Sequence, residues 1–297
     1  MPELPEVETV RRSLERVLVG QTLARIDLRR ADLRFPFPEH FAERLTGRVI
    51  TGVQRRAKYL QVMLDSRDVL IIHLGMTGRF IVAAPGVDTV RGAVVGDYVY
   101  ETGHLPQHDH VVLETAGGLR ITYNDPRRFG YMLLEAEADL QSHALFRALG
   151  VEPLGNELDG ALLAKRAAGR RADLKAFLMD QRNIAGLGNI YVCEALFRAG
   201  LSPRRRAGTL AGRGGKPTER TARLVPAIRQ VLTEAVEAGG STLRDYRQPD
   251  GRAGAFQDRH DVYDREGEEC RKPGCSGIIR RITQAGRSTF YCPRCQT

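Results

Sequence analysis

The chain has 297 residues, a formal net charge of +9 and a hydrophobic fraction of 42%, which excludes wholesale disorder. It has no apolar run of the ~18 residues that a membrane span needs and no signal peptide, so we expect a soluble, cytoplasmic protein. Of its 45 basic residues only five are lysines, so forty are arginines. The basic surplus fits a polyanionic partner, but a GC-rich genome also raises arginine, and composition does not separate the two.

The first predicted element is an amphipathic helix close to the N-terminus. Apolar residues recur at helical spacing from Val7 to Leu18, and Gly20 stands just past the expected end. Pro2 brings chemistry to this segment. Once Met1 is removed, the secondary amine of Pro2 is exposed and can add to a sugar aldehyde carbon to form an iminium. An α-amino group has a reference pKa of roughly 8, so a free fraction exists near neutral pH.

Residues 21–135 are rich in short β-like runs that Gly and Asn or Asp turns separate. Several short strands at this spacing are typical of an antiparallel sandwich or barrel. The stretch 84–107 is Gly-rich, and we expect an extended loop there. The predicted strands lie at 49–53, 59–64, 69–74, 80–82, 110–113 and 119–123.

From residue 141 onward the pattern becomes helical, and Pro and Gly residues separate the expected helices. The segment 201–230 carries eight basic side chains and one acidic side chain. Residues 239–261 have many turn formers and few apolar residues, which predicts a long loop of the kind that is often functional. The predicted helices lie at 143–149, 160–168, 174–180, 189–199 and 218–238.

Four of the five cysteines lie in the last 28 residues, as a C-x4-C pair, sixteen further residues and a C-x2-C pair. Two such pairs, separated by a hairpin length, can supply four thiolates to one tetrahedral Zn²⁺. Two disulfides are the alternative, which a cytosolic location disfavours. The predicted ligands are Cys270, Cys275, Cys292 and Cys295. The fifth cysteine, Cys193, falls in an apolar helix, where we expect a buried free thiol.

Five segments together resemble the bacterial formamidopyrimidine-DNA glycosylases, in the family's order and across essentially the whole chain. They are the start MPELPEVETV, the HLGMTG of 73–78, the NDPRRFG of 124–130, the GLGNIY of 186–191 and the four-cysteine finger. The resemblance implies an α+β fold with one structural Zn²⁺. It implies an N-terminal β-sandwich domain over 1–138, a helix–two-turns–helix DNA-binding domain over 139–261 and a zinc finger over 262–297.

The resemblance also implies an activity. The family excises oxidised purines, such as 8-oxoguanine and formamidopyrimidines, from double-stranded DNA and then cleaves the abasic site by β,δ-elimination. By this resemblance Pro2 is the nucleophile that forms a Schiff base at C1′, and Glu3 protonates the opening deoxyribose. Lys58 is tied to β-elimination, and Arg287, at the tip of the predicted finger hairpin, to δ-elimination. The enzyme would act as a monomer in the bacterial cytoplasm, at the nucleoid.

An extruded base leaves a hole in the duplex and an orphaned partner base. Met76, Arg127 and Phe129 match the family's void-filling residues, and a thioether, a guanidinium and a phenyl ring suit that task. Taken alone, Met76 and Phe129 would be ordinary core residues. The resemblance further implies that residues 242–256 close over the extruded purine.

The resemblance assigns further DNA contacts to His73, His108, Arg170, Asn189 and Tyr263, and lesion recognition to Lys175. A helix N-cap is the alternative for Asn189, and a solvated helix lysine is the alternative for Lys175.

The chain departs from the family pattern at three places. Many members have C-x2-C at the first cysteine pair and glycine at position 264, where this chain has Asp264, and the Gly-rich stretch 84–107 is longer than average. Two other functions are open. Endonuclease VIII, the sister enzyme for oxidised pyrimidines, typically begins Pro-Glu-Gly-Pro-Glu, whereas this chain has Leu4 after Glu3. A non-catalytic damage-binding protein is disfavoured because Pro2, Glu3 and Lys58 are all present.

Overall fold

The computed structural model describes residues 2–84, 93–95, 98–100, 105–241 and 254–297. They form two compact units, Met1–Phe146 with Ala238–Gln257, and Arg147–Glu237 with Asp258–Thr297, and each is described by itself. The predicted α+β class is confirmed. Within the described ranges, no helix is long and apolar enough to cross a membrane. The division into three domains at 138 and 261 stays a prediction.

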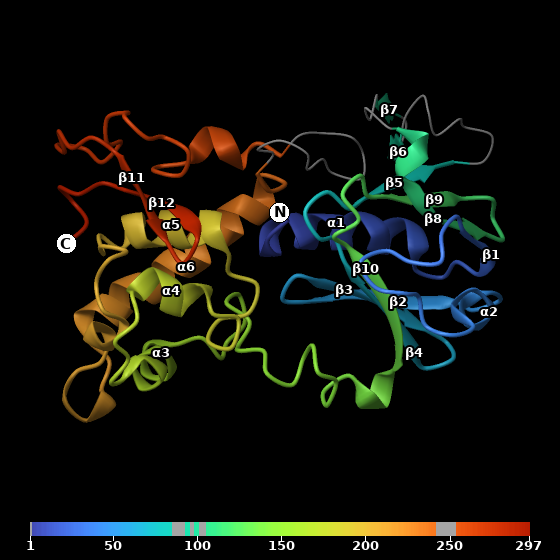
Figure 1. The fold of residues 1–297 in the computed structure, drawn as a ribbon, viewed down its shortest axis with the longest axis horizontal. Helices are drawn as coiled ribbons and strands as arrows, with labels where there is room; N and C mark the ends of the chain where they lie inside the picture. Colours follow the sequence, from blue (N-terminus) through green and yellow to red (C-terminus); the bar gives the residue numbers. More distant parts are fainter. Residues whose placement is uncertain (1, 85–92, 96–97, 101–104, 242–253) are drawn as a thin grey trace. The chain divides into compact units, whose positions relative to one another are not determined.

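The first unit contains two four-stranded antiparallel sheets with a shared core (Figure 1). One sheet has the order β1 (Leu23–Leu28), β8 (Asp109–Thr115), β9 (Arg120–Asn124) and β5 (Arg79–Ala83). The other has the order β10 (Tyr131–Ala136), β4 (Asp68–His73), β3 (Tyr59–Leu64) and β2 (Ile50–Arg56). The strands predicted from the sequence are confirmed, because each overlaps one of these strands and its ends agree to within three residues.

Helix α1 (Leu4–Leu18) packs along β2 and closes this core. Its stripe of Val7, Val10, Leu14 and Leu18 is at most 2% exposed, as the helical spacing predicts. Fully burying each such side chain stabilises the fold by roughly 1.5–3 kcal/mol. The helix that carries Pro2 and Glu3 at its start is therefore fixed on the sheets. A short helix, α2 (Phe41–Leu45), follows β1.

Two predictions for the first unit need correction. The described part of 84–107 is not simply an extended loop, because β6 (Ala93–Val95) and β7 (Tyr98–Tyr100) pair and η1 (Pro106–His108) follows. The rest of that stretch lies outside the described residues. The helix predicted at 143–149 is wrong, since the residues there form turns. The Leu145 N–H donates to Nδ1 of His143 (3.2 Å), and this local side-chain bond competes with helical hydrogen bonds.

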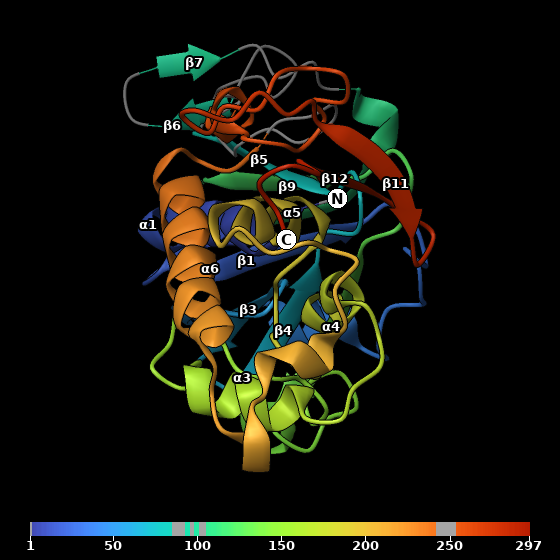
Figure 2. The same ribbon diagram turned by 90° about the vertical axis from the view of Figure 1, so that its left-hand side faces the viewer.

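The second unit consists of four helices and the finger hairpin, and the other four predicted helices are confirmed. The helices are α3 (Gly160–Ala167), α4 (Leu174–Met179), α5 (Asn189–Arg198) and α6 (Glu219–Glu237). The hairpin strands β11 (Arg280–Gln284) and β12 (Arg287–Tyr291) pair antiparallel, and β12 contacts α5 (Figure 2). Cys193 and Phe197 of α5 share a core with Phe290 of β12, so the finger packs on this helix. Cys193 is a buried free thiol, as predicted.

Candidate functional site

The start of α1 is held by a reciprocal capping arrangement. The N–H of Glu3, the N-cap residue, donates to Oε2 of Glu6 (2.7 Å), and Oε1 of Glu6 accepts the Ser241 N–H (2.8 Å). Pro2, Glu3 and Glu6 are all buried. Gly240 (φ +82°) permits this approach, because a Cβ there would lie 2.8 Å from Glu6 Oε1. The Pro2 nitrogen is thus held at the positive end of a helix.

The sequence did not lead us to expect this capping role of Glu6, although its capping-box spacing to Glu3 was the available signal.

Lys58 lies in the tight turn between β2 and β3 and is 9% exposed. Arg55 ties this turn to α1, because its Nη1 donates to the Ala57 carbonyl (3.0 Å) and its Nε to Oε2 of Glu8 (3.0 Å). Burial raises the pKa of Glu8, but hydrogen bonds from Arg11 and Arg55 outweigh it, so the pKa is below its ordinary value. A charged pair therefore fixes the Lys58 turn on α1, the helix that follows Pro2 and Glu3.

His73 ends β4 and stacks on Tyr131, with ring centroids 5.2 Å apart and an interplanar angle of 14°. Burial, together with the charges of Lys58 and Arg34, lowers its pKa to about 4. The Gly75 N–H donates to His73 Nδ1 (3.1 Å), so Nδ1 acts as the acceptor. The neutral ring then carries its proton on Nε2, which can donate to a phosphate oxygen.

A buried carboxylate joins the two loops that carry the predicted void-filling residues. Asp125 is 0% exposed, and it accepts from Thr77 Oγ1 (2.5 Å) and from the Gly130 N–H (2.9 Å). Thr77 in turn accepts the Arg127 N–H (3.2 Å). The turn 74–78 and the loop 125–130 therefore form one hydrogen-bonded frame, which we call the Asp125 frame. The sequence motifs include Thr77 and Asp125 but gave no sign of their contact.

The glycines of these motifs are required by close packing within the frame. A Cβ on Gly75, which has a φ of +63°, would lie 2.3 Å from the Phe129 carbonyl carbon. A Cβ on Gly130 would lie 1.8 Å from the Tyr123 hydroxyl. No real Cβ tolerates such distances, so only glycine fits at either position.

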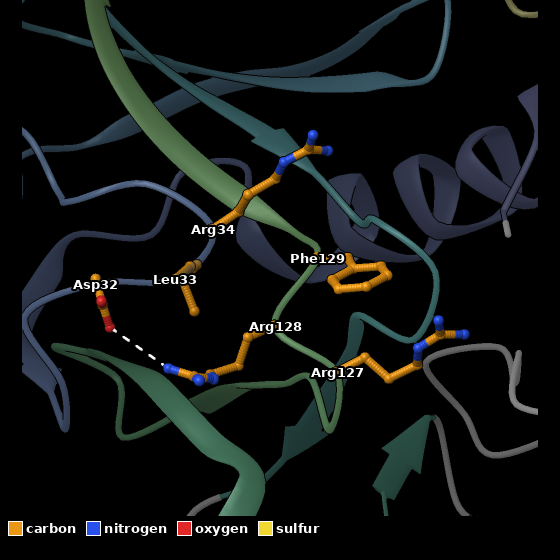
Figure 3. Close-up of a pocket in the computed structure, with 6 residues that line it drawn as sticks. All are labelled: Asp32, Leu33, Arg34, Arg127, Arg128 and Phe129. Carbon is orange, nitrogen blue, oxygen red and sulfur yellow. Dashed lines mark ion pairs between the residues drawn. The ribbon is translucent and has the colours of Figure 1, made fainter.

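The Asp125 frame presents an arginine and a phenyl ring to solvent. The Arg127 guanidinium lies 4.7 Å from the Phe129 ring centroid, and Phe129 is 43% exposed, so Phe129 is not a core residue. Figure 3 shows these two side chains together, while Arg128 turns away toward Asp32 (3.7 Å). All four residues, with Leu33 and Arg34, line a pocket of about 450 Å³.

Two more predicted residues belong to this region. Met76 lies in the turn 74–78 and is half-buried. His108 ends η1, and its carbonyl accepts the Asp125 N–H (3.0 Å). The structure therefore brings His108, Met76, Arg127 and Phe129 around one frame.

The four finger cysteines converge as a metal site requires. Their Sγ atoms all lie within 4.8 Å of one another, with Cys270 and Cys295 3.8 Å apart and Cys275 and Cys292 3.7 Å apart. A tetrahedron with Zn–S bonds of about 2.3 Å has edges of about 3.8 Å. The C-x4-C spacing is therefore compatible with a four-thiolate zinc site. Gly277 is part of it, since a Cβ there would lie 2.6 Å from Cys292 Sγ.

Several predicted DNA contacts meet at the finger hairpin. Asn189 is the first residue of α5 and Gly188 is its N-cap, so the N-cap alternative for Asn189 is wrong. Its Nδ2 donates to the Ser288 carbonyl (3.0 Å) and to the Tyr263 hydroxyl (3.3 Å). Lys175 is 1% exposed, so it is not a solvated lysine. Arg287, at the start of β12, and Arg170, after α3, are both exposed.

Glu194 of α5 holds the segment before the finger. It is 0% exposed, and its carboxylate accepts the N–H groups of Asp261 (2.8 Å), Val262 (3.0 Å) and Tyr263 (2.8 Å). An acid within an apolar helix was the sequence signal for such a role. Asp264 has a φ of +60°, which explains why glycine is usual at this position and shows that Asp adopts the same conformation here.

The burial of Glu194 predicts a pH dependence of stability. Burial raises its pKa to about 7 despite the three backbone donors, from 4.5. The native state then holds a proton that the unfolded chain has lost. The contribution of the protonated Glu194 side chain to the free energy of unfolding is therefore fully present below pH ~4.5 and is lost as the pH rises through ~7. This contribution is on the order of 3 kcal/mol.

We measure the free energy of urea unfolding of wild type and of Glu194→Gln with zinc present. From pH 5 to pH 8 we expect wild type to lose stability relative to Glu194→Gln. A difference that does not change with pH would contradict this prediction.

The predicted capping segment 242–256 falls largely outside the described residues, which include only 254–256 of it. Its flanks lie close together. The Phe256 N–H donates to the Gly240 carbonyl (3.1 Å), and the Ala255 N–H to the Ala238 carbonyl (3.0 Å).

Three family profiles match this chain. They are the formamidopyrimidine-DNA glycosylase N-terminal domain over residues 1–132, the formamidopyrimidine-DNA glycosylase H2TH domain over 149–247, and the zinc finger found in FPG and IleRS over 267–297. Formamidopyrimidine-DNA glycosylases from a Chelativorans strain and from Beijerinckia indica are each 59% identical to it, over 100% of both chains.

Solved structures agree. The MutM (Fpg) protein of Thermus thermophilus is 40% identical over 99% of this chain and 98% of its own, with a TM-score of 0.81. Lactococcus lactis Fpg has been solved with DNA that contains an abasic site and with DNA that contains N7-benzyl-Fapy-dG, at 32% identity, full coverage of both chains and a TM-score of 0.82. The finger match and the four converging thiols identify one structural Zn²⁺ site.

Proposed function

The chain belongs to the formamidopyrimidine-DNA glycosylase family, and on this premise we propose that it excises oxidised purines from duplex DNA through a Schiff base at Pro2 and then cleaves the strand by β,δ-elimination. Membership makes it a DNA glycosylase of base excision repair. One observation carries the proposal furthest. The capping of α1 fixes Pro2 and Glu3 together at a buried helix start, and Arg55 anchors the Lys58 turn to the same helix.

In the proposed reaction, the Pro2 amine attacks C1′ of the extruded nucleotide and loses its proton as the N–C1′ bond forms. The glycosidic bond breaks, and the base leaves with its electron pair and takes up a proton in place of the one that the amine released. Glu3 protonates O4′ as the C1′–O4′ bond opens, which leaves an iminium between Pro2 and C1′.

The iminium withdraws electrons from the sugar and so acidifies the C2′ proton. Loss of that proton and cleavage of C3′–O3′ expel the 3′ phosphate, and the Lys58 ammonium would offset its charge. Loss of the C4′ proton and cleavage of C5′–O5′ then expel the 5′ phosphate with its electron pair. Arg287 would hold this second phosphate through its guanidinium fork.

The proposed DNA contacts fit the chemistry of the sites that carry them. His73 offers a neutral N–H donor, Arg170 is an exposed cation, and the Asp125 frame presents Arg127 and Phe129. Insertion of such side chains into the duplex would offset the cost of unstacking the lesion. We place the enzyme in the cytoplasm, as a monomer at the nucleoid.

Cleavage of two duplexes tests the substrate class. We expect the protein to cleave an 8-oxoguanine:cytosine duplex faster than a thymine-glycol:adenine duplex in single-turnover assays, because the exposed Arg127 guanidinium can donate to the O2 and N3 acceptors of an orphaned cytosine. Faster cleavage of the pyrimidine lesion would indicate an endonuclease VIII-like enzyme. Binding of both duplexes without cleavage would indicate a damage-binding protein.

A further inference from the structure

Lys175 of α4 bonds to the strand that carries Arg287. Its Nζ donates to the Ser288 carbonyl (3.1 Å) and to Oγ1 of Thr289 (2.6 Å). Lys175 is 1% exposed and Thr289 is 0% exposed. The ammonium therefore lies inside the second unit, bonded to the two residues that follow Arg287.

The tip of the hairpin is held on its other side as well. Gln284, the register partner of Arg287, donates through Nε2 to Oδ2 of Asp173 (3.0 Å) and to the Pro203 carbonyl (3.3 Å). Asn189 adds a second donor to the Ser288 carbonyl (3.0 Å). Residues on both strands next to the turn are thus bonded to the helical part of the same unit.

These bonds are important because the side chain of Arg287 is exposed and flexible, so its position depends on how firmly its backbone is held. A flexible side chain finds one phosphate oxygen efficiently only if its backbone is already in place, and a misplacement of about 1 Å can cost a factor of a hundred in rate. The Lys175 ammonium is the charged donor among these attachments, and hydrogen bonds from charged groups are about twice as strong as neutral ones.

We propose that Lys175 is a positioning residue, which fixes the finger hairpin so that Arg287 reaches the 5′ phosphate in δ-elimination, and that it does not contact DNA. This inference rests on the proposed function, in which Arg287 serves that step.

The test separates the two elimination steps. On a duplex with a preformed abasic site, single-turnover products are resolved by gel into the 3′-unsaturated aldehyde of β-elimination and the 3′-phosphate of δ-elimination. Lys175→Met keeps the length of the side chain but removes the donors. We expect it to slow δ-elimination roughly tenfold, while β-elimination and borohydride trapping stay near wild type.

Three further variants sharpen the result. Lys175→Arg restores donors at this position and is expected to recover most of the δ-elimination. Thr289→Val removes one acceptor of Lys175 at constant volume and should show a smaller defect of the same kind. Lys165→Met, in which an exposed lysine of α3 is removed from the same unit, should behave as wild type. Zinc content is measured for every variant, so that a misfolded finger is recognised by metal loss.

The outcomes separate this inference from the proposed function. An unchanged ratio of δ to β product in both Lys175→Met and Thr289→Val would overturn the inference. An equal loss of DNA affinity and of both elimination steps in Lys175→Met would also overturn it, in favour of a direct DNA contact. If wild type forms no δ product, or Arg287→Gln forms as much as wild type, the assigned role of Arg287 fails, and the inference fails with it.

Discussion

Replacement of Pro2 by glycine is expected to lower the yield of borohydride-trapped adduct on an 8-oxoguanine:cytosine duplex by a factor of about a hundred or more. The secondary amine gives the iminium directly, and its ring is buried at the capped start of α1. Glycine offers a primary amine on an unrestrained backbone and loses that placement. Adducts are measured on denaturing gels, with removal of Met1 verified by mass spectrometry.

Pro5→Ala is the matched control. Pro5 is also buried in the first turn of α1, but its nitrogen is not at the processed end of the chain. We expect this variant to form adduct at nearly the wild-type level. If Pro2→Gly traps as well as wild type while Lys58→Met does not, the covalent nucleophile is a lysine, and the proposed mechanism is wrong.

The second large effect concerns the metal. Cys292→Ser is expected to lose the structural zinc and to weaken binding to a duplex with a tetrahydrofuran abasic analogue on the order of tenfold to a hundredfold. Cys292 is 0% exposed, its Sγ lies 3.7 Å from that of Cys275, and the core beneath the finger includes it. Zinc is measured by atomic absorption and binding by fluorescence anisotropy.

Cys193→Ser provides the comparison, because Cys193 is a buried thiol of the same core but not one of the four converging thiols. It should cost some stability and retain zinc. Full zinc content and unchanged DNA affinity in Cys292→Ser would contradict the finger assignment.

Local periodicity and spacing carried the sequence predictions. The stripe from Val7 to Leu18, the alternating strands and the two short cysteine spacings each report on neighbours a few residues apart. The expected helices, sheets and four-thiol group follow from them. The helix predicted at 143–149 was wrong because it rested on a short apolar pattern alone. In the structure the Leu145 N–H bonds to the His143 side chain, and this local bond competes with the helical hydrogen bonds.

Contacts between distant residues were beyond the reach of those patterns. Glu6 and Ser241 are 235 residues apart, and Lys175 and Thr289 are 114 apart. The periodicity of a helix does not show whether an acidic residue or a lysine on it is solvated or bonded to a main-chain group far away in the sequence. The two alternatives, a solvated lysine at Lys175 and an N-cap at Asn189, are therefore wrong. Family resemblance supplied candidate roles, and the structure supplied what the side chains touch.

In the Asp125 frame, the residues that hold the two loops together are different from the residues whose side chains are exposed at the loop tips. Its hydrogen bonds are made by the side chains of Thr77, Asp125 and Tyr123 and by main-chain groups, while the side chains of Arg127 and Phe129 project away. During the divergence of related sequences, positions 76, 127 and 129 are thus free to change one at a time. Positions 77 and 125 are expected to change together, because a substitution at only one of them would leave a buried polar group without a hydrogen-bond partner. A library confined to the three tip positions would explore opposite-base preference without unfolding its scaffold.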